Sequence, residues 1–260
     1  MDRHQVSDYR RASTVCLVRD NPDLEVLMVQ RPHTSRFMPS VWVFPGGAVD
    51  PEDAEPPTSF GDADDWHVAA LRELGEEVGL WLTTDGVVEQ AGVDDAFAFV
   101  SEAGFTPDAE ALIYFSNWVT PEVFPLRFDT RFFLAAIDGS VDGAVDGDEL
   151  VDLAWVGPME ALRREQDQEW DVAFPTRKIL ELLASEPSAA SLAATMRNLA
   201  IVPPVQPRLY VTSDEARIVM PDEDLFDAIE ADQADPDILG RLAAVIAKGG
   251  HLPAEFKGGR

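Results

Sequence analysis

Residues 72–80 read Arg-Glu-Leu-Gly-Glu-Glu-Val-Gly-Leu and form the most informative stretch of the chain. On a helix of 3.6 residues per turn, Glu73, Glu76 and Glu77 stand at i, i+3 and i+4 and share one face. Three carboxylates this close repel one another unless a cation lies between them, and their oxygen atoms suit a hard divalent ion such as Mg²⁺. Gly79 can end the helix in a left-handed conformation. The stretch therefore predicts a helix with a metal-binding face.

Two further features frame this helix. Leu71, Leu74 and Val78 fall on another face, so they can anchor the helix in a core. Upstream, residues 44–47 read Phe-Pro-Gly-Gly, a turn whose glycines let backbone amides approach an anion. An acidic helix face alone is commonly only a solvated surface, and the upstream turn is what favours a functional site.

Together these residues resemble the conserved sequence box of the Nudix hydrolase family. That family's box reads Gly, five residues, Glu, seven residues, then Arg-Glu-apolar-any-Glu-Glu-any-Gly-apolar. Residues 72–80 fit the second half at every fixed position, and Gly47 fits the start. From Gly47 to Arg72 is 25 positions where the family has 14, an insertion of 11. Counting back eight from Arg72 places Asp64 where the family has Glu.

The resemblance implies a fold and a chemistry. The fold is α/β (α+β), with a mixed β-sheet sandwiched between helices and the box as loop-helix-loop. Glu73, Glu76 and Glu77 would bind Mg²⁺ or Mn²⁺, and Glu77 or Glu76 would also act as base toward water during hydrolysis of a diphosphate bond. Arg72 would orient a box glutamate through a bidentate pair.

The turn and its upstream flank suggest the substrate. Gly46 and Gly47 would abut the metal and a phosphate. Nudix enzymes that cleave coenzyme A carry Arg, three residues, Gly and three residues before Phe-Pro-Gly-Gly; Arg36 keeps this spacing, while Ser40 replaces the Gly. Arg36 is thus a candidate phosphate contact, with a surface arginine as the equal alternative.

The chain is also similar to acyl-CoA diphosphatases of the mammalian peroxisomal type, which share an insertion in the box. They share sequences like those at residues 118–122 and 127–133 as well. This resemblance implies coenzyme A or an acyl-CoA as substrate, giving 3′,5′-ADP and (acyl) 4′-phosphopantetheine. NADH, ADP-ribose and dinucleoside polyphosphates are the alternative substrates. The alternative to an enzyme is a Nudix-like nucleotide sensor without turnover. Such a sensor would not need three crowded carboxylates.

Four other residues are candidates with competing roles. Arg131 is a candidate substrate contact, and Arg127 is either a second one or a structural partner of a nearby acid. Glu149 and Asp64 are candidates to join the metal site, although an ordinary acidic turn explains Glu149 as well.

Composition limits the partners. Net charge is −28, from 48 acids against 20 bases, so the surface repels nucleic acid and anionic membranes. A small anionic nucleotide can still bind where a cation and local arginines overcome the remote field. No run of 18 apolar residues indicates a membrane span, and residues 1–5 lack a signal-peptide pattern, so we expect a cytoplasmic protein. The single cysteine, Cys16, excludes an internal disulfide and fits a buried thiol. The family also suggests a homodimer.

The chain divides into three predicted parts: a polar arm at 1–12, the Nudix domain at 13–187 and a C-terminal extension at 188–260. Residues 50–65 are expected to be a loop with little to bury. The extension is expected to pack on the core as helix and hairpin, with a disordered tail from about residue 232 as the alternative.

Overall fold

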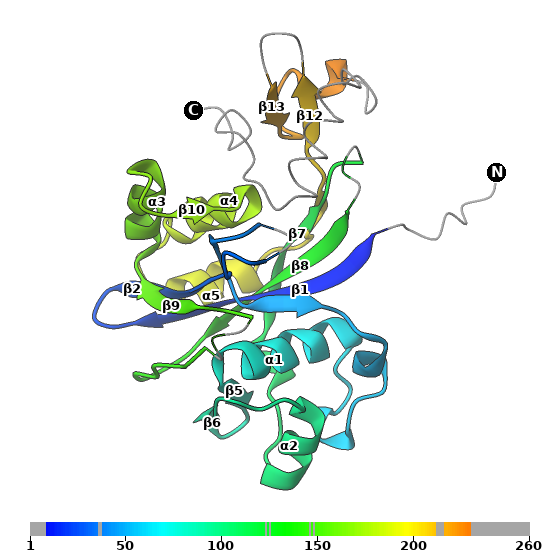
Figure 1. Ribbon diagram of the computed structural model, residues 1–260, viewed down its shortest axis with the longest axis vertical. Helices are drawn as coiled ribbons and strands as arrows, with labels where there is room; N and C mark the ends of the chain where they lie inside the picture. Colours follow the sequence, from blue (N-terminus) through cyan, green and yellow to red (C-terminus); the bar gives the residue numbers. More distant parts are fainter. Residues whose placement is uncertain are drawn as a thin grey trace, which may run out of the picture.

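The computed structural model describes residues 9–35, 38–122, 124, 126–145, 147, 149–211 and 216–229. Within these residues the chain forms a mixed α/β structure, shown in Figure 1. None of its helices combines the length and the apolar character needed to cross a bilayer. The alternative of a disordered tail from about residue 232 lies outside the described residues.

Nine of the described strands join in one mixed sheet with the order β10-β3-β2-β1-β8-β7-β11, while β4 pairs with β1 and β9 pairs with β2. The strands are β1 (Arg10–Asp20), β2 (Leu24–Gln30), β3 (Val41–Val43), β4 (Gly46–Ala48), β7 (Ile113–Val119), β8 (Phe128–Ala136), β9 (Asp152–Val156), β10 (Asp171–Val172) and β11 (Pro204–Val205). Two hairpins stand outside it: β5 (Leu80–Thr83) with β6 (Gly86–Glu89), and β12 (Arg208–Val211) with β13 (Ala216–Val219).

Helices cover both faces of the sheet, as Figure 1 shows. On one face lie α1 (Asp65–Val78), α2 (Ala96–Ala103) and the β5–β6 hairpin. On the other lie α3 (Pro158–Gln166), α4 (Phe174–Leu183) and α5 (Ala189–Arg197). Each face has its own apolar core, and β1 contributes to both because its side chains alternate between the two faces. The expected sandwich of a mixed sheet between helices is confirmed.

Helix α1 ends at the glycine that its sequence predicts, and an aspartate caps its start. Asp64 is the N-cap, and its side chain accepts a hydrogen bond from the backbone N–H of His67. Gly79 ends the helix in the left-handed conformation, with φ of 66°. Leu74 and Val78 are fully buried, so the apolar face anchors α1 on the sheet and leaves the acidic face toward the β4 turn.

Two expectations about the N-terminal half need correction. Strand β1 begins at Arg10, inside the predicted arm, because its first residues pair with β8. The segment 50–65 contains two 3₁₀ turns, Pro51–Ala54 and Thr58–Phe60, and it buries Asp53 completely and Phe60 almost completely. The prediction that this segment has little to bury was therefore wrong.

The C-terminal extension packs on the domain as far as it is described. Leu192 and Met196 of α5 are buried in the core beneath β7 and β8. Strands β12 and β13 form the predicted hairpin, and Arg208 donates hydrogen bonds to the carbonyl oxygens of Phe226 and Ile229. Cys16 is buried, as expected.

Candidate functional site

The diglycine turn lies directly against α1. Strand β4 pairs with β1 so closely that a Cβ on Gly46, whose φ is +150°, would lie 2.2 Å from the carbonyl oxygen of Ser13. A Cβ on Gly47 would lie 2.4 Å from the carboxyl carbon of Glu73. Glycine is therefore required at both positions for the turn and the acidic face to meet.

At this contact Glu77 is buried, and Glu73 is partly buried, with 13% of its side chain exposed. The backbone N–H of Gly46 donates a 2.7 Å hydrogen bond to Oε2 of Glu77, a residue that is only 9% exposed. Burial raises the pKa of Glu77 well above 4.5, and the charge of Glu73 raises it further. Burial likewise raises the pKa of Glu73 to about 7, against the opposing effect of Arg72. The site thus holds two carboxylates whose negative charge the protein does not fully neutralise.

Arg72 joins the acidic face to the inserted segment. Its Nε and Nη2 donate to Oδ1 and Oδ2 of Asp53 at 2.9 and 3.0 Å, and its Nη1 donates to Glu73 at 2.9 Å and Glu76 at 3.0 Å. The carboxylate bonds raise the pKa of Arg72 although burial lowers it. The expected contact with a box glutamate is present, while the bidentate partner is Asp53.

Asp53 is the residue that the sequence reasoning missed. Counting back from Arg72 gave Asp64, but Asp64 caps α1 and hydrogen-bonds His67 instead. In the family's box, five residues separate the Gly from the first Glu, and the same spacing after Gly47 gives Asp53. The insertion therefore lies between Asp53 and α1. The forward count was the signal that could have found it.

Glu76 shares Arg72 with Glu73 and also contacts α2. Its Oε1 accepts a 3.2 Å hydrogen bond from the N–H of Ala96 at the start of α2, and its Oε2 accepts from Arg72. In the part of the chain that the structure describes, no three acidic, histidine or cysteine side chains stand together as a ready metal site. The predicted triplet therefore splits into a buried pair, Glu73 and Glu77, with Glu76 beside it.

Charges from two loops surround the buried pair. Glu149, before β9, raises the pKa of both Glu73 and Glu77, whereas Arg31, at the end of β2, lowers the pKa of Glu77. Both therefore lie close enough to act on the site. Arg36 lies outside the described residues.

Arg131 lies near the other end of α1. Its guanidinium stacks 4.2 Å from the Trp66 ring centroid, and its Nη1 is 3.8 Å from Oδ2 of Asp64. Asp64 precedes Glu73 by nine residues, about 14 Å along a helix. The structure thus does not bring Arg131 to the glutamate pair. Arg127 stacks on Tyr9, with 4.8 Å from its Cζ to the ring centroid.

The buried pair suits a divalent cation. Carboxylate oxygens are the ligands that Mg²⁺ and Mn²⁺ prefer, and a cation between Glu73 and Glu77 would balance the negative charge of both carboxylates. The charges of Glu76 and Glu149 act on Glu73, so these residues are candidates to join such a donor set.

The sequence and the fold are similar to those of known proteins. The NUDIX domain model matches residues 9–178. Putative nudix hydrolase 7 of Caenorhabditis elegans is 32% identical over 187 residues, which cover 68% of this chain and 60% of that protein. Acyl-coenzyme A diphosphatase NUDT19 of Gallus gallus is 26% identical over 248 residues, covering 64% of this chain and 66% of that protein. The chain thus spans less than two thirds of the length of both relatives.

A solved structure is similar over its full length. The crystal structure of a NUDIX hydrolase from Alicyclobacillus acidocaldarius is 34% identical, covers 76% of this chain and 100% of its own, and has a TM-score of 0.64. With a family model that matches well over half of the chain, and with the diglycine turn against the acidic helix, this chain belongs to the NUDIX domain family.

Proposed function

We propose that this chain is a divalent-metal-dependent diphosphatase that cleaves a nucleoside-diphosphate-linked metabolite. The observation that carries the proposal is the pair of incompletely neutralised carboxylates against the diglycine turn, namely the buried Glu77 and the partly buried Glu73. A structural helix face would place these carboxylates in solvent, because burying an uncompensated charge is unfavourable. Membership of the family and the hydrolase names of its relatives support the same class of reaction.

The residues of the site would have separate roles in holding the metal and in positioning its ligands. Glu73 and Glu77, with Glu76 and Glu149, would hold Mg²⁺ or Mn²⁺. When bound, the cation supplies Lewis acidity toward a phosphoryl oxygen and makes an attacking water more acidic. The Gly46 N–H keeps Glu77 in place, and Arg72 keeps Glu73 and Glu76 oriented through its bond to Asp53.

The proposed hydrolysis accounts for every atom without a reactant other than water. Water adds to one phosphorus, and its proton passes to Glu77 or Glu76 and then to solvent. The bridging oxygen leaves with the other phosphate. Arg31 is positioned to contact a phosphate oxygen, since its charge already acts on Glu77. Arg36 and Arg131 remain predicted substrate contacts.

For the substrate, we propose coenzyme A or an acyl-CoA. The support is the Arg36 spacing and the similarity to acyl-coenzyme A diphosphatases of Gallus gallus and Xenopus laevis. A nucleotide sensor without turnover is the second candidate, because the carboxylates as they stand do not form a complete cation site.

A panel assay separates these proposals. The protein is incubated with Mg²⁺ or Mn²⁺ and coenzyme A, octanoyl-CoA, NADH, ADP-ribose or diadenosine tetraphosphate, and products are quantified by chromatography. We expect 3′,5′-ADP and 4′-phosphopantetheine from coenzyme A. Binding of a compound without any hydrolysis, in the presence of either metal, would favour the nucleotide sensor over the diphosphatase.

A further inference from the structure

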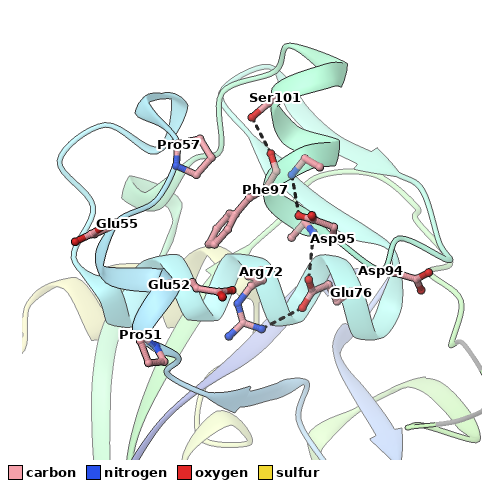
Figure 2. Close-up of a pocket in the computed structure, with 12 residues that line it drawn as sticks. Pro51, Glu52, Glu55, Pro57, Arg72, Glu76, Asp94, Asp95, Phe97 and Ser101 are labelled. Carbon is pink, nitrogen blue, oxygen red and sulfur yellow. Dashed lines mark hydrogen bonds and ion pairs between the residues drawn. The ribbon is translucent and has the colours of Figure 1, made fainter.

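A cleft lies between the segment 51–57 and α2, and it is lined by Arg72 and Glu76 of α1. Its volume is about 880 Å³, within the range of small-molecule sites. One wall is the inserted segment of the box and the other is α2, with Arg72 and Glu76 of α1 as its floor (Figure 2). The cleft exists because the insertion bends over α1, a path held by the Asp53–Arg72 bonds.

The floor of the cleft adjoins the glutamate site, because Arg72 and Glu76 belong to both. Glu76 accepts hydrogen bonds from Arg72 and from the N–H of Ala96 in α2, and Arg72 also reaches Glu73. A substrate whose diphosphate lies at Glu73 and Glu77 therefore has one end next to the cleft.

The charge of the cleft excludes phosphate. Glu52 and Asp95 line it together with Glu76, and the cation among its lining residues, Arg72, is already bonded to carboxylates. An anionic group placed there would meet like charges at short range. The phosphorylated nucleotide half of a substrate is therefore better placed outside this cleft.

The remaining lining suits an uncharged chain. Figure 2 shows the ring of Phe97 projecting from α2 toward Arg72, opposite Pro51 and Pro57 of the insertion, whereas Asp94 points away toward the periphery. Apolar rings can cover methylene groups, and the carboxylates at the edges can accept hydrogen bonds from amide N–H groups.

We propose that this cleft binds the uncharged, amide-bearing arm of the substrate, namely a pantetheine chain and the acyl group attached to it. The inference rests on the proposed function and adds a role for the box insertion and α2: they select the group on the non-nucleotide side of the diphosphate. Ala98 and Ser101 line the cleft from exposed positions of α2, so larger side chains there would fill it without disturbing the core.

The test compares Ala98→Trp and Ser101→Trp with the control Glu102→Trp, an exposed residue of α2 outside the cleft lining. Octanoyl-CoA carries the long arm, and ADP-ribose carries a short sugar instead. We expect the ratio of kcat/KM for octanoyl-CoA to that for ADP-ribose to fall at least about 10-fold in both cleft variants and to stay within about 2-fold in the control. Calorimetric binding of octanoyl-CoA in EDTA should weaken to a similar extent.

The outcomes separate the two proposals. Turnover by the wild type with an unchanged ratio in the cleft variants would overturn the cleft assignment alone. Absence of turnover by the wild type would refute the proposed function, and the binding measurement would then decide the cleft. A Glu52→Lys variant adds a charge test: tighter binding of both compounds would place a phosphate in the cleft and contradict the proposal.

Discussion

Replacing Glu73 by Gln should stabilise the metal-free protein at alkaline pH. Burial raises the pKa of Glu73 to about 7, against about 4.5 in the unfolded chain. The folded state therefore binds more protons than the unfolded state between these values, so stability falls as pH rises from about 4.5 to 7. The shift of about 2.5 units corresponds to at most about 3 kcal/mol at pH 8.

Gln has nearly the same shape as Glu, carries no charge and can still accept the bond from Arg72. We expect the free energy of unfolding in EDTA to rise by about 1 to 3 kcal/mol at pH 8, and by under about 1 kcal/mol at pH 5, where the folded-state Glu73 is already protonated. Urea unfolding at both pH values measures this. Glu102→Gln, which removes an exposed charge from α2, is the matched control and should show no such pH dependence.

Adding Mg²⁺ at pH 8 should make the wild type more stable than Glu73→Gln. The wild type gains about 2.7 kcal/mol when the cation is present at 100 times its Kd, and Glu73→Gln gains much less. A variant that is equally stabilised at pH 5 and pH 8, or destabilised at pH 8, would refute the reasoning that Glu73 is a buried, uncompensated charge.

Three further variants test other parts of the site. Glu77→Gln should fold normally, judged by circular dichroism, and should lower kcat at least about 100-fold; unchanged turnover would remove Glu77 from the chemistry. Gly47→Ala should keep the fold but push the Glu73 carboxyl from the turn, and a Mn²⁺ titration that matches wild type would argue against that contact. Asp53→Asn should lower stability by about 1 to 3 kcal/mol in urea unfolding and also reduce kcat, because Arg72 loses a bidentate partner; loss of stability with full activity would limit Asp53 to a structural role.

The local rules of helix and turn were readable from the sequence. The spacing of the apolar residues, Asp64 before the helix and Gly79 after it correctly predict α1, and the paired glycines predict its close contact with β4. These features depend on neighbours in the chain, so a sequence pattern captures them.

The long-range features were not readable in the same way. A helical repeat places three glutamates on one face, but it does not show that Glu76 also accepts a hydrogen bond from the N–H of Ala96. That bond depends on α2, whose first residue lies 20 positions further along the chain and meets α1 only in the folded state.

The inserted segment shows the same limit. Its Pro and acidic residues resemble a solvated loop, and only the fold shows that Asp53 turns inward to Arg72. Arg131 lies on the strand next to β1, yet its side chain stacks on Trp66 rather than reaching the glutamates, because the contacts of β8 place it over the N-terminal end of α1.

The most direct test of the central claim is to locate the cation. Crystals grown with Mn²⁺ should give an anomalous scattering peak between the carboxylates of Glu73 and Glu77, about 2 Å from an oxygen of each and next to the diglycine turn. The same peak should be lost in Glu73→Gln. A Mn²⁺ peak elsewhere in the molecule, or a site at the turn empty at saturating Mn²⁺ and pH 8, would contradict the account.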